Sequence, residues 1–326
     1  MRTKVILAVA FAAFASTCLS SAQAQSVLTG GKSGAYFSVL CPGLVDGLRN
    51  EGFTPTCTET SGTPDNISKV LADPTAIAFV QGDAYANWAA THADDAAKLT
   101  IVRSDLASES VYFVSKNVKS FGDLVRFVTR AKFVLPPQTS GAAQTWENLK
   151  AQLPQVFSKV DASQITYAAS TDAAVAAALA TDNTIALLVQ LPDPENTVFK
   201  TIVEKKGNFI PIVARALLNQ QVAGQNVYTL ETRPVTKAGL VKGAIEVTTI
   251  ATPIAIITQP SSAIPEGGNA RTNHEDLIKI IKSLPKEKLL PKSGATASLF
   301  SRAYSATKDA ATSLTNDAEQ AIKGLK

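Results

Sequence analysis

The sequence predicts an α/β fold made of two consecutive units, each with a mostly parallel sheet. Short apolar segments of strand length alternate with longer segments whose apolar residues recur every three or four positions. Glycine, serine, threonine and proline gather where a strand segment gives way to a helix segment. The alternation restarts near residue 110. This rhythm is typical of parallel strands connected by helices.

The first unit alternates strand, helix, strand, helix and strand. Its predicted strands are the runs Val27–Thr29, Thr54–Glu59 and Ile77–Gln81. The first helix is predicted from apolar side chains spaced four residues apart, Tyr36, Leu40, Leu44 and Leu48. It ends before Gly52, and Pro64 suits the first turn of the second helix.

The second unit opens with a strand at Ser110–Ser115 and repeats the pattern. Further strands are predicted at Lys132–Leu135, Gln164–Ala168, Ile185–Gln190 and Phe209–Val213. Helices are predicted at Phe121–Thr129, from Ala142 onward, after the cap Ser170–Asp172, and at Asn196–Lys205. The β-branched run Val247–Thr258 is expected to return to the first sheet. It is followed by a polar loop at Ser261–Asn273 and by helices at Glu275–Leu284 and Ser305–Lys323.

The N-terminus predicts export. Arg2 and Lys4 precede the apolar run Val5–Ala15, and Ala22-Gln23-Ala24 fits a signal-peptidase site, so residues 1–24 are predicted to be a signal peptide. The apolar run is too short for a permanent membrane helix, which needs roughly 20 residues. A soluble periplasmic protein is therefore expected. The alternative, a lipoprotein anchored at Cys18, fits poorly with the residues before that cysteine.

Two cysteines, Cys41 and Cys57, remain after such processing. In an oxidising compartment they are expected to form a disulfide, and the alternative is two separate buried thiols. Neither is expected to be catalytic, because no histidine lies near either one in sequence.

Composition argues against several classes of function. The formal charge of +4 is spread along the chain without a basic run, so a nucleic-acid surface is not expected. The mild positive charge is compatible with an anionic ligand. Aromatic residues make up 6% of the chain, which disfavours a sugar-stacking site.

No catalytic or metal-binding motif is expected to function. His92 and His274 are far apart and predicted to be surface or capping residues, so neither a metal nor a cofactor is expected. The stretch Ser283–Lys286 has the spacing of a serine–lysine catalytic motif, but Pro285 would break the helix that this motif needs. The protein is therefore not expected to be an enzyme, although a serine centre assembled in space remains an alternative.

Three polar turns predict a binding site. Gly30–Gly34 is no phosphate loop, because Ser26 stands where that motif needs glycine, but a glycine-rich turn before a helix can bind an anion. Ser61–Thr63 and Thr139–Gly141 have the same character. Each could be an ordinary turn or helix cap. Together they predict a cleft that holds a polar group, and Gln81 with Asp83 either shares that rim or caps the next helix.

Several segments resemble the TAXI-type solute receptors of TRAP transporters. The stretch Thr29–Phe37 resembles the opening signature of that family, and Thr60–Ile67 resembles its next signature. Phe79–Asp83 is similar to a strand that ends in glutamine–x–aspartate. Gln138–Ala142 corresponds more loosely to a loop of the second lobe, and Ala177–Pro192 to a later helix, strand and proline turn.

The resemblance implies a type II periplasmic binding protein with two lobes and a hinge. It divides the mature chain into residues 25–115 of lobe 1, residues 116–228 of lobe 2, and residues 229–326, which return to lobe 1 and end in helices. The implied ligand is a carboxylate or an amino acid such as glutamate, delivered to membrane transporter subunits. The implied ligand-binding residues are Gly31, Lys32, Tyr36, Ser61, Thr63, Asn66, Gln81, Thr139, Ser140 and Gly141.

Three other functions remain as alternatives to a TRAP receptor. An ABC-type receptor would bind an oxyanion or a thiamine precursor, and a sensor module would use the same fold without transport. An exported hydrolase would cleave esters or amides.

Overall fold

The computed structural model describes residues 25–32, 34–238, 243–286, 304–305 and 308–324. The predicted signal peptide and Cys18 lie outside the described residues. Within them, no helix is long and apolar enough to cross a membrane.

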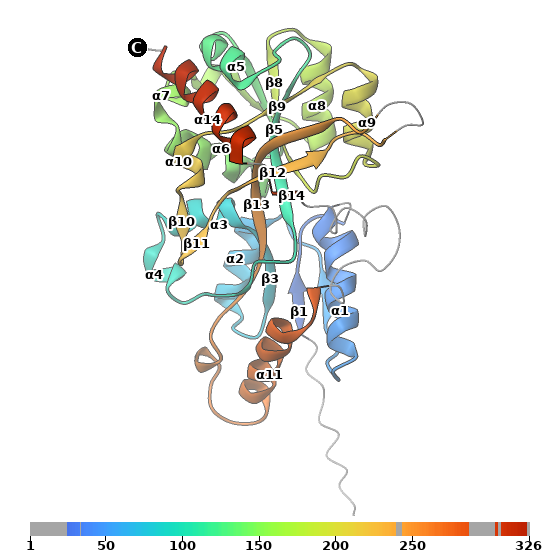
Figure 1. The fold of residues 1–326 in the computed structure, drawn as a ribbon. Helices are drawn as coiled ribbons and strands as arrows, with labels where there is room; N and C mark the ends of the chain where they lie inside the picture. The colour runs from blue at the N-terminus through green and yellow to red at the C-terminus, as the bar shows by residue number, and fades with distance from the viewer. Residues whose placement is uncertain (1–24, 33, 239–242, 287–303, 306–307, 325–326) are drawn as a thin grey trace, which may run out of the picture.

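The chain forms two lobes, each with a five-stranded arrangement of the same order (Figure 1). In lobe 1 the order is β2-β1-β3-β13-β4, and in lobe 2 it is β7-β6-β8-β5-β9. The lobe 1 strands are β1 (Ser26–Leu28), β2 (Thr56–Thr58), β3 (Ile77–Gln81), β4 (Thr100–Arg103) and β13 (Glu246–Thr258). The lobe 2 strands are β5 (Ser108–Ser115), β6 (Lys132–Leu135), β7 (Ile165–Tyr167), β8 (Thr184–Gln190) and β9 (Asn208–Pro211).

Most strands in each lobe run parallel. Strand β1 is parallel to β2 and β3, and β6 is parallel to β7 and β8. One strand in each lobe is antiparallel to its neighbours, β13 in lobe 1 and β5 in lobe 2. The predicted α/β fold with a mostly parallel sheet in each lobe is confirmed. The short strand β4 is a member of lobe 1 that the sequence analysis did not identify.

Strands β5 and β13 form the hinge between the lobes. They pair with each other where Ser108, Glu109 and Ser110 face Pro253, Thr252 and Ala251. Beyond this point β5 continues into the lobe 2 sheet, and β13 continues into the lobe 1 sheet. The other half of β13 pairs with β12 (Thr229–Pro234). The lobes are therefore joined by continuous extended backbone.

Lobe 1 is covered by helices packed on both faces of its sheet. They are the π-helical turn η1 (Tyr36–Leu40), α1 (Cys41–Arg49), α2 (Thr63–Ala72), α3 (Gly82–Ala89), the short α4 (Ala93–Ala96), the 3-10 turn η3 (Ser261–Ala263) and α11 (Ala270–Ser283). The face with α1 and α11 buries Leu44, Leu48, Leu277 and Ile281 against the sheet. The opposite face buries Ile67 and Val70 of α2.

Two sequence predictions in this region are wrong. The helix predicted from Glu275 begins at Ala270, so the last residues of the predicted polar loop are helical. His274 was predicted to be a surface or capping residue, but it lies inside α11 and is 1% exposed. Its Nε2 lies 3.2 Å from the Thr258 hydroxyl and 3.1 Å from the Gln259 carbonyl oxygen, so this nitrogen keeps polar partners despite burial, whereas Nδ1 has none among the described residues.

Lobe 2 has a core dominated by aromatic side chains. Trp146 packs against Phe113, Phe133 and Phe157. The surrounding helices are α5 (Phe121–Phe127), α6 (Gly141–Gln152), α7 (Pro154–Phe157), the 3-10 turn η2 (Ala162–Gln164), α8 (Thr171–Ala180), α9 (Thr197–Glu204) and α10 (Arg215–Leu218). Four of them begin with a side-chain cap, from Ser120, Ser140, Ser170 and Asn196.

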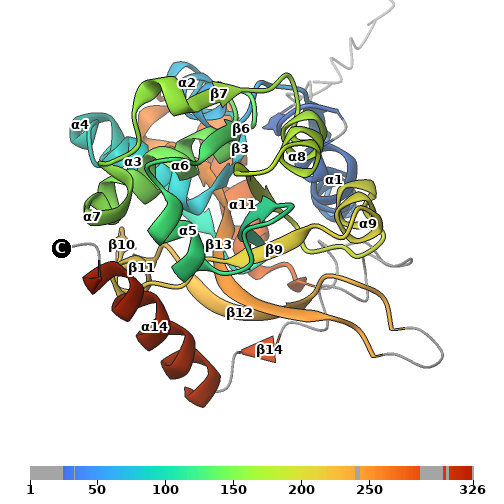
Figure 2. The same ribbon diagram turned by 90° about the horizontal axis from the view of Figure 1, so that it is seen from above.

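The remaining described segments are a short hairpin that contacts α3 of lobe 1, two paired strands, and a helix on lobe 2 (Figure 1). A hairpin of β10 (Gln221–Val222) and β11 (Gln225–Asn226) precedes β12, and β14 (Tyr304–Ser305) pairs with β12. Helix α14 (Lys308–Lys323) packs against α5 and crosses the outside of the lobe (Figure 2). The division of the chain at residues 115 and 228 remains a prediction.

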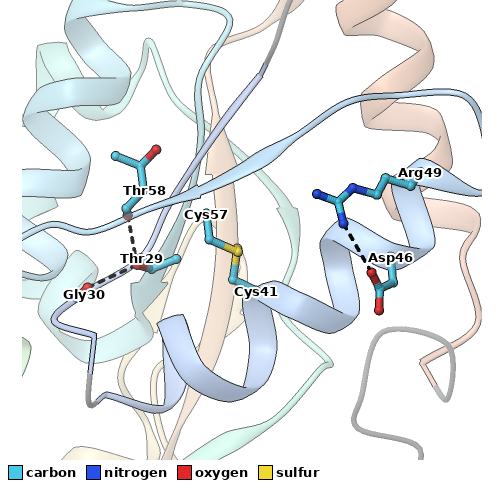
Figure 3. Close-up of a disulfide and its surroundings, with 7 residues drawn as sticks. All are labelled: Thr29, Gly30, Cys41, Asp46, Arg49, Cys57 and Thr58. Carbon is cyan, nitrogen blue, oxygen red and sulfur yellow. Dashed lines mark hydrogen bonds and ion pairs between the residues drawn. A yellow bond between two sulfur atoms is a disulfide. The ribbon is translucent and has the colours of Figure 1, made fainter.

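The predicted disulfide joins Cys41 and Cys57, with 6.0 Å between their Cα atoms. It fastens the start of α1 to β2, directly beside the turn that follows β1 (Figure 3). There the Thr29 hydroxyl lies 2.9 Å from the Thr58 carbonyl oxygen and 3.1 Å from that of Gly30. The bridge and these contacts fix the carboxyl end of β1 at the edge that faces lobe 2.

Candidate functional site between the lobes

Two of the three predicted turns face each other across the junction of the lobes. Ser61–Thr63 leads into α2 of lobe 1, and Thr139–Gly141 leads into α6 of lobe 2. A Cβ atom on Gly62 would lie 3.6 Å from the Gly141 backbone nitrogen and 3.8 Å from the Ser140 Cα. Gly62 has φ of 116°, a conformation that favours glycine. The lobes are therefore in contact through these turns.

Gln81, at the end of β3, connects the two turns. Its backbone N–H donates to the Thr63 hydroxyl at 3.0 Å. Its side-chain Nε2 donates to Thr145 of α6 and to Asp83, both at 2.5 Å. A Cβ atom on Gly141 would lie 2.8 Å from the Gln81 Oε1. Gln81 thus bonds to both lobes while only 4% exposed.

Asp83, in the first turn of α3, is completely buried at the same junction. It accepts hydrogen bonds from the Tyr228 hydroxyl at 2.8 Å and from the Ala84 backbone N–H at 2.8 Å, in addition to Gln81. Its own backbone N–H donates to the Thr252 hydroxyl on β13. Burial raises the pKa of Asp83, although the bonds from Gln81 and Tyr228 oppose that rise.

Glu109, on hinge strand β5, accepts a hydrogen bond from the Tyr36 hydroxyl at 2.8 Å. The carboxyl is 8% exposed, and burial together with the charge of Asp83 raises its pKa to about 8, although the Tyr36 bond lowers it. Burial and Glu109 raise the pKa of Tyr36 as well. The bond between Tyr36 and Glu109 connects Tyr36, a predicted ligand-binding residue, to the hinge strand β5.

Backbone N–H groups at the two helix starts are left without partners. The Ser140 hydroxyl accepts from the Ala143 N–H, but no hydrogen bond among the described residues uses the N–H of Gly141 or Ala142. The same holds for the Thr63 N–H at the start of α2. Such N–H groups, at the positive end of a helix dipole, favour an anionic group.

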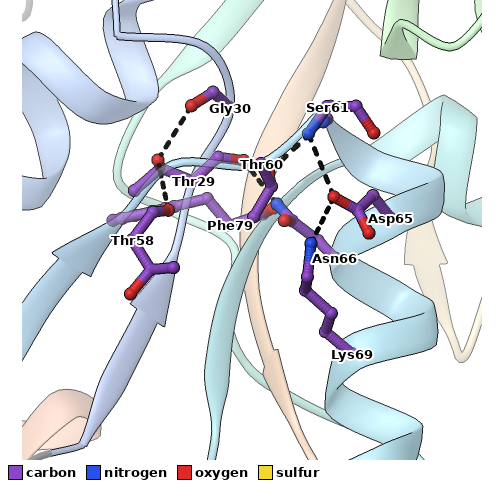
Figure 4. Close-up of polar contacts among 10 residues, drawn as sticks. Thr29, Gly30, Thr58, Thr60, Ser61, Asp65, Asn66, Lys69 and Phe79 are labelled. Carbon is purple, nitrogen blue, oxygen red and sulfur yellow. Dashed lines mark hydrogen bonds and ion pairs between the residues drawn. The ribbon is translucent and has the colours of Figure 1, made fainter.

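Three predicted residues are not joined to this group. The Lys32 backbone N–H donates to Glu59, and its ammonium lies 3.7 Å from the same carboxylate with 72% of the side chain exposed. A Cβ atom on Gly31 would contact nothing. Asn66 is fully buried, and its Nδ2 donates to the carbonyl oxygens of Thr29 and Phe79 (Figure 4). Asn66 thereby connects the residue that follows β1 to the middle of β3.

The turn before α2 is also held by bonds of its own (Figure 4). The Ser61 N–H donates to Asp65 at 3.1 Å, and Asp65 accepts from the Lys69 ammonium at 2.5 Å. The Ser61 side chain remains exposed. These bonds fix the shape of the turn from the lobe 1 side.

The junction is a contact between lobes in this structure. A surface hollow of about 550 Å³ lies between α5 and α14, and none of the predicted ligand-binding residues lines it. No group of three or more histidine, cysteine, aspartate or glutamate side chains within the described residues is arranged to hold a metal.

Three residues of this junction were not predicted from the sequence. They are Glu109, which bonds to Tyr36, Thr145, which bonds to Gln81, and Tyr228, which bonds to Asp83. A single glutamate within the apolar strand Ser108–Ser115 is the signal that could have identified Glu109.

Comparisons with known proteins give weak likenesses only. No protein-family model matches the chain, and no curated protein matches it in sequence. A solved structure described as a periplasmic transporter is 12% identical, covers 93% of this chain and 95% of its own, and has a TM-score of 0.45. The GluR0 ligand-binding core in complex with L-glutamate is 9% identical (86% and 98% coverage, TM-score 0.44). The periplasmic binding protein BugD is 11% identical (92% and 95% coverage, TM-score 0.40). At these TM-scores the likenesses decide neither fold nor ligand.

Proposed function

We propose that the protein is an exported solute-binding receptor that captures a small carboxylate or amino acid between its lobes and delivers it to a TRAP transporter. One observation carries the binding role: the turns before α2 and α6, from different lobes, face each other and carry unpartnered backbone N–H groups. The delivery step rests on the resemblance of Thr29–Phe37 and Thr60–Ile67 to TAXI-type receptors.

The mechanism is closure about the hinge. With the lobes apart, the N–H groups of both helix starts would face water. A ligand that bonds to both turns stabilises the closed state over the open state by its difference in affinity for the two. A membrane partner can then distinguish the loaded form by its shape. The protein breaks no bond in this scheme.

Substitution of Ser140 by tryptophan tests the site. The indole would stand where the Thr139–Gly141 turn faces Gly62, so Ser140→Trp should abolish ligand binding. Thermal unfolding of the wild type would be followed with L-glutamate, L-glutamine, glutarate, succinate and phosphate. A compound at about 1,000 times its Kd adds roughly 4 kcal/mol to the free energy of unfolding.

Ser170→Trp is the matched control. Ser140 caps α6 and Ser170 caps α8, and both helices belong to lobe 2. Each substitution therefore removes a helix cap that contributes about 1 kcal/mol to stability. The control should keep the full ligand response. An equal response in Ser140→Trp would place the ligand elsewhere. Stabilisation by phosphate alone would favour an ABC-type oxyanion receptor.

A further inference from the structure

The junction of the lobes holds two buried carboxyl groups with no cationic side chain to neutralise them. Asp83 is 0% exposed and Glu109 is 8% exposed. No ion pair in the described part of the chain includes either carboxyl. Lys32, the one basic residue predicted at the site, faces Glu59 instead. A purely anionic ligand would therefore enter a junction that already carries acidic groups.

The two carboxyl groups differ in how their oxygens are used. Both oxygens of Asp83 accept hydrogen bonds, one from Gln81 and Ala84 and the other from Tyr228. Glu109 accepts one bond, from Tyr36 to its Oε2. No hydrogen bond among the described residues reaches its Oε1. Glu109 thus has an acceptor oxygen available to a ligand.

Glu109 lies on the strand next to the polar contacts that lead to the turn before α6. It lies opposite Thr252 in the pairing of β5 with β13, and the Thr252 hydroxyl accepts the Asp83 N–H. Asp83 bonds to Gln81, whose Oε1 lies against Gly141. The junction therefore offers an acceptor at one end and free N–H donors at the other.

On the premise of the proposed function, we propose that Glu109 and Tyr36 form the subsite for an ammonium group of the ligand. The ligand is then a zwitterion such as an α-amino acid, and its carboxylate lies at the helix start formed by Gly141 and Ala142. Glu109 is the specificity-determining residue, because a buried carboxylate without a counter-charge is costly and an ammonium removes that cost.

The protonation of Glu109 agrees with this assignment. Burial, with the nearby charge of Asp83, raises the pKa of Glu109 to about 8, so this carboxyl is mostly protonated near neutral pH when no cation lies beside it. The titratable groups that influence the pKa of Glu109 are Asp83 of α3 and Tyr36 of η1. Pairing with an ammonium favours the charged carboxylate and releases the proton.

Matched pairs of compounds test the proposal by calorimetric titration. Each pair differs only in the α-amine: L-glutamate with glutarate, L-glutamine with glutaramate, and L-aspartate with succinate. In the wild type, at least one amine-bearing member should bind tenfold or more tighter than its partner. Glu109→Gln should remove that preference, whereas Glu204→Gln, at an exposed position of α9, should retain it.

Each other outcome has a definite meaning. Binding of the compounds without amines at equal or higher affinity would overturn the ammonium subsite and leave the receptor function standing. An amine preference that survives Glu109→Gln would overturn the role of Glu109. Binding of no compound in the panel would overturn both the subsite and the proposed function.

Discussion

At the scale of single residues, the site depends on where charged and polar side chains lie after folding. Lys32 stood beside the predicted anion turn in sequence, yet its ammonium pairs with Glu59 at the surface. Glu109 lies within an apolar strand, yet it is buried at the junction with an Oε1 that accepts no hydrogen bond from the described residues. Periodicity identifies buried positions, but it does not identify which neighbour satisfies a buried polar group. The family resemblance implied that Asn66 contacts ligand, and in the structure its amide donates to the carbonyl oxygens of Thr29 and Phe79.

The raised pKa of Glu109 predicts a pH-dependent stability. Its pKa in the folded protein is about 8, against 4.5 when unperturbed. Between these values the folded state holds a proton that the unfolded state has lost. Stability from this group therefore falls as pH rises, by up to about 1.4 kcal/mol per pH unit, and levels off above the folded pKa.

Chemical denaturation of wild type and Glu109→Gln, without ligand, from about pH 5 to pH 8 measures this effect. The variant cannot titrate at this position, so its stability should exceed that of the wild type by a margin that grows with pH. His274, whose pKa is lowered by burial, titrates in both proteins and cancels in the difference. A constant margin across the range would mean that Glu109 is ionised in the folded state.

At the scale of elements, regular segments were predictable and exceptions arose from tertiary contacts. Strands β3, β5, β6 and β8 were predicted within a few residues, because each contains a run of apolar residues, although Lys132 of β6 is exposed. Helix α3 follows β3 without a loop, because Gly82 allows it to approach β13 closely. A Cβ atom there would lie 2.9 Å from the Pro253 carbonyl oxygen. Such proximity depends on a strand about 170 residues later, which local sequence does not reveal.

The disulfide is the element-scale feature with the clearest energetic consequence. It closes a loop with a sequence separation of 16, for which chain entropy predicts about 3 kcal/mol of stabilisation. Cys41→Ala combined with Cys57→Ala should lower the free energy of unfolding by about that amount in urea denaturation. Wild type treated with a reductant should approach the variant. Equal stability of oxidised wild type and variant would show that the bridge adds nothing.

At the scale of the whole molecule, two lobes of the same strand order meet where β5 pairs with β13, where the polar turns face each other, and where α3 packs against α6. The sequence predicted the α/β pattern and two of the turns that meet. It did not predict that their contact would be direct, because the relative position of the lobes depends on the hinge. The bonds from Gln81 to Thr145 and from Tyr228 to Asp83 hold the lobes in the described arrangement.

The distance between the lobes is the measurement that tests this account most directly. Spin labels at Asp94→Cys in α4 of lobe 1 and at Gln155→Cys in α7 of lobe 2 occupy exposed positions, and Cys41 and Cys57 are already paired. Adding the stabilising compound of the screen should narrow the distance distribution to the value of the described structure, and Ser140→Trp should prevent the change. A distribution that is the same with and without a bound compound would contradict closure of the lobes upon a ligand.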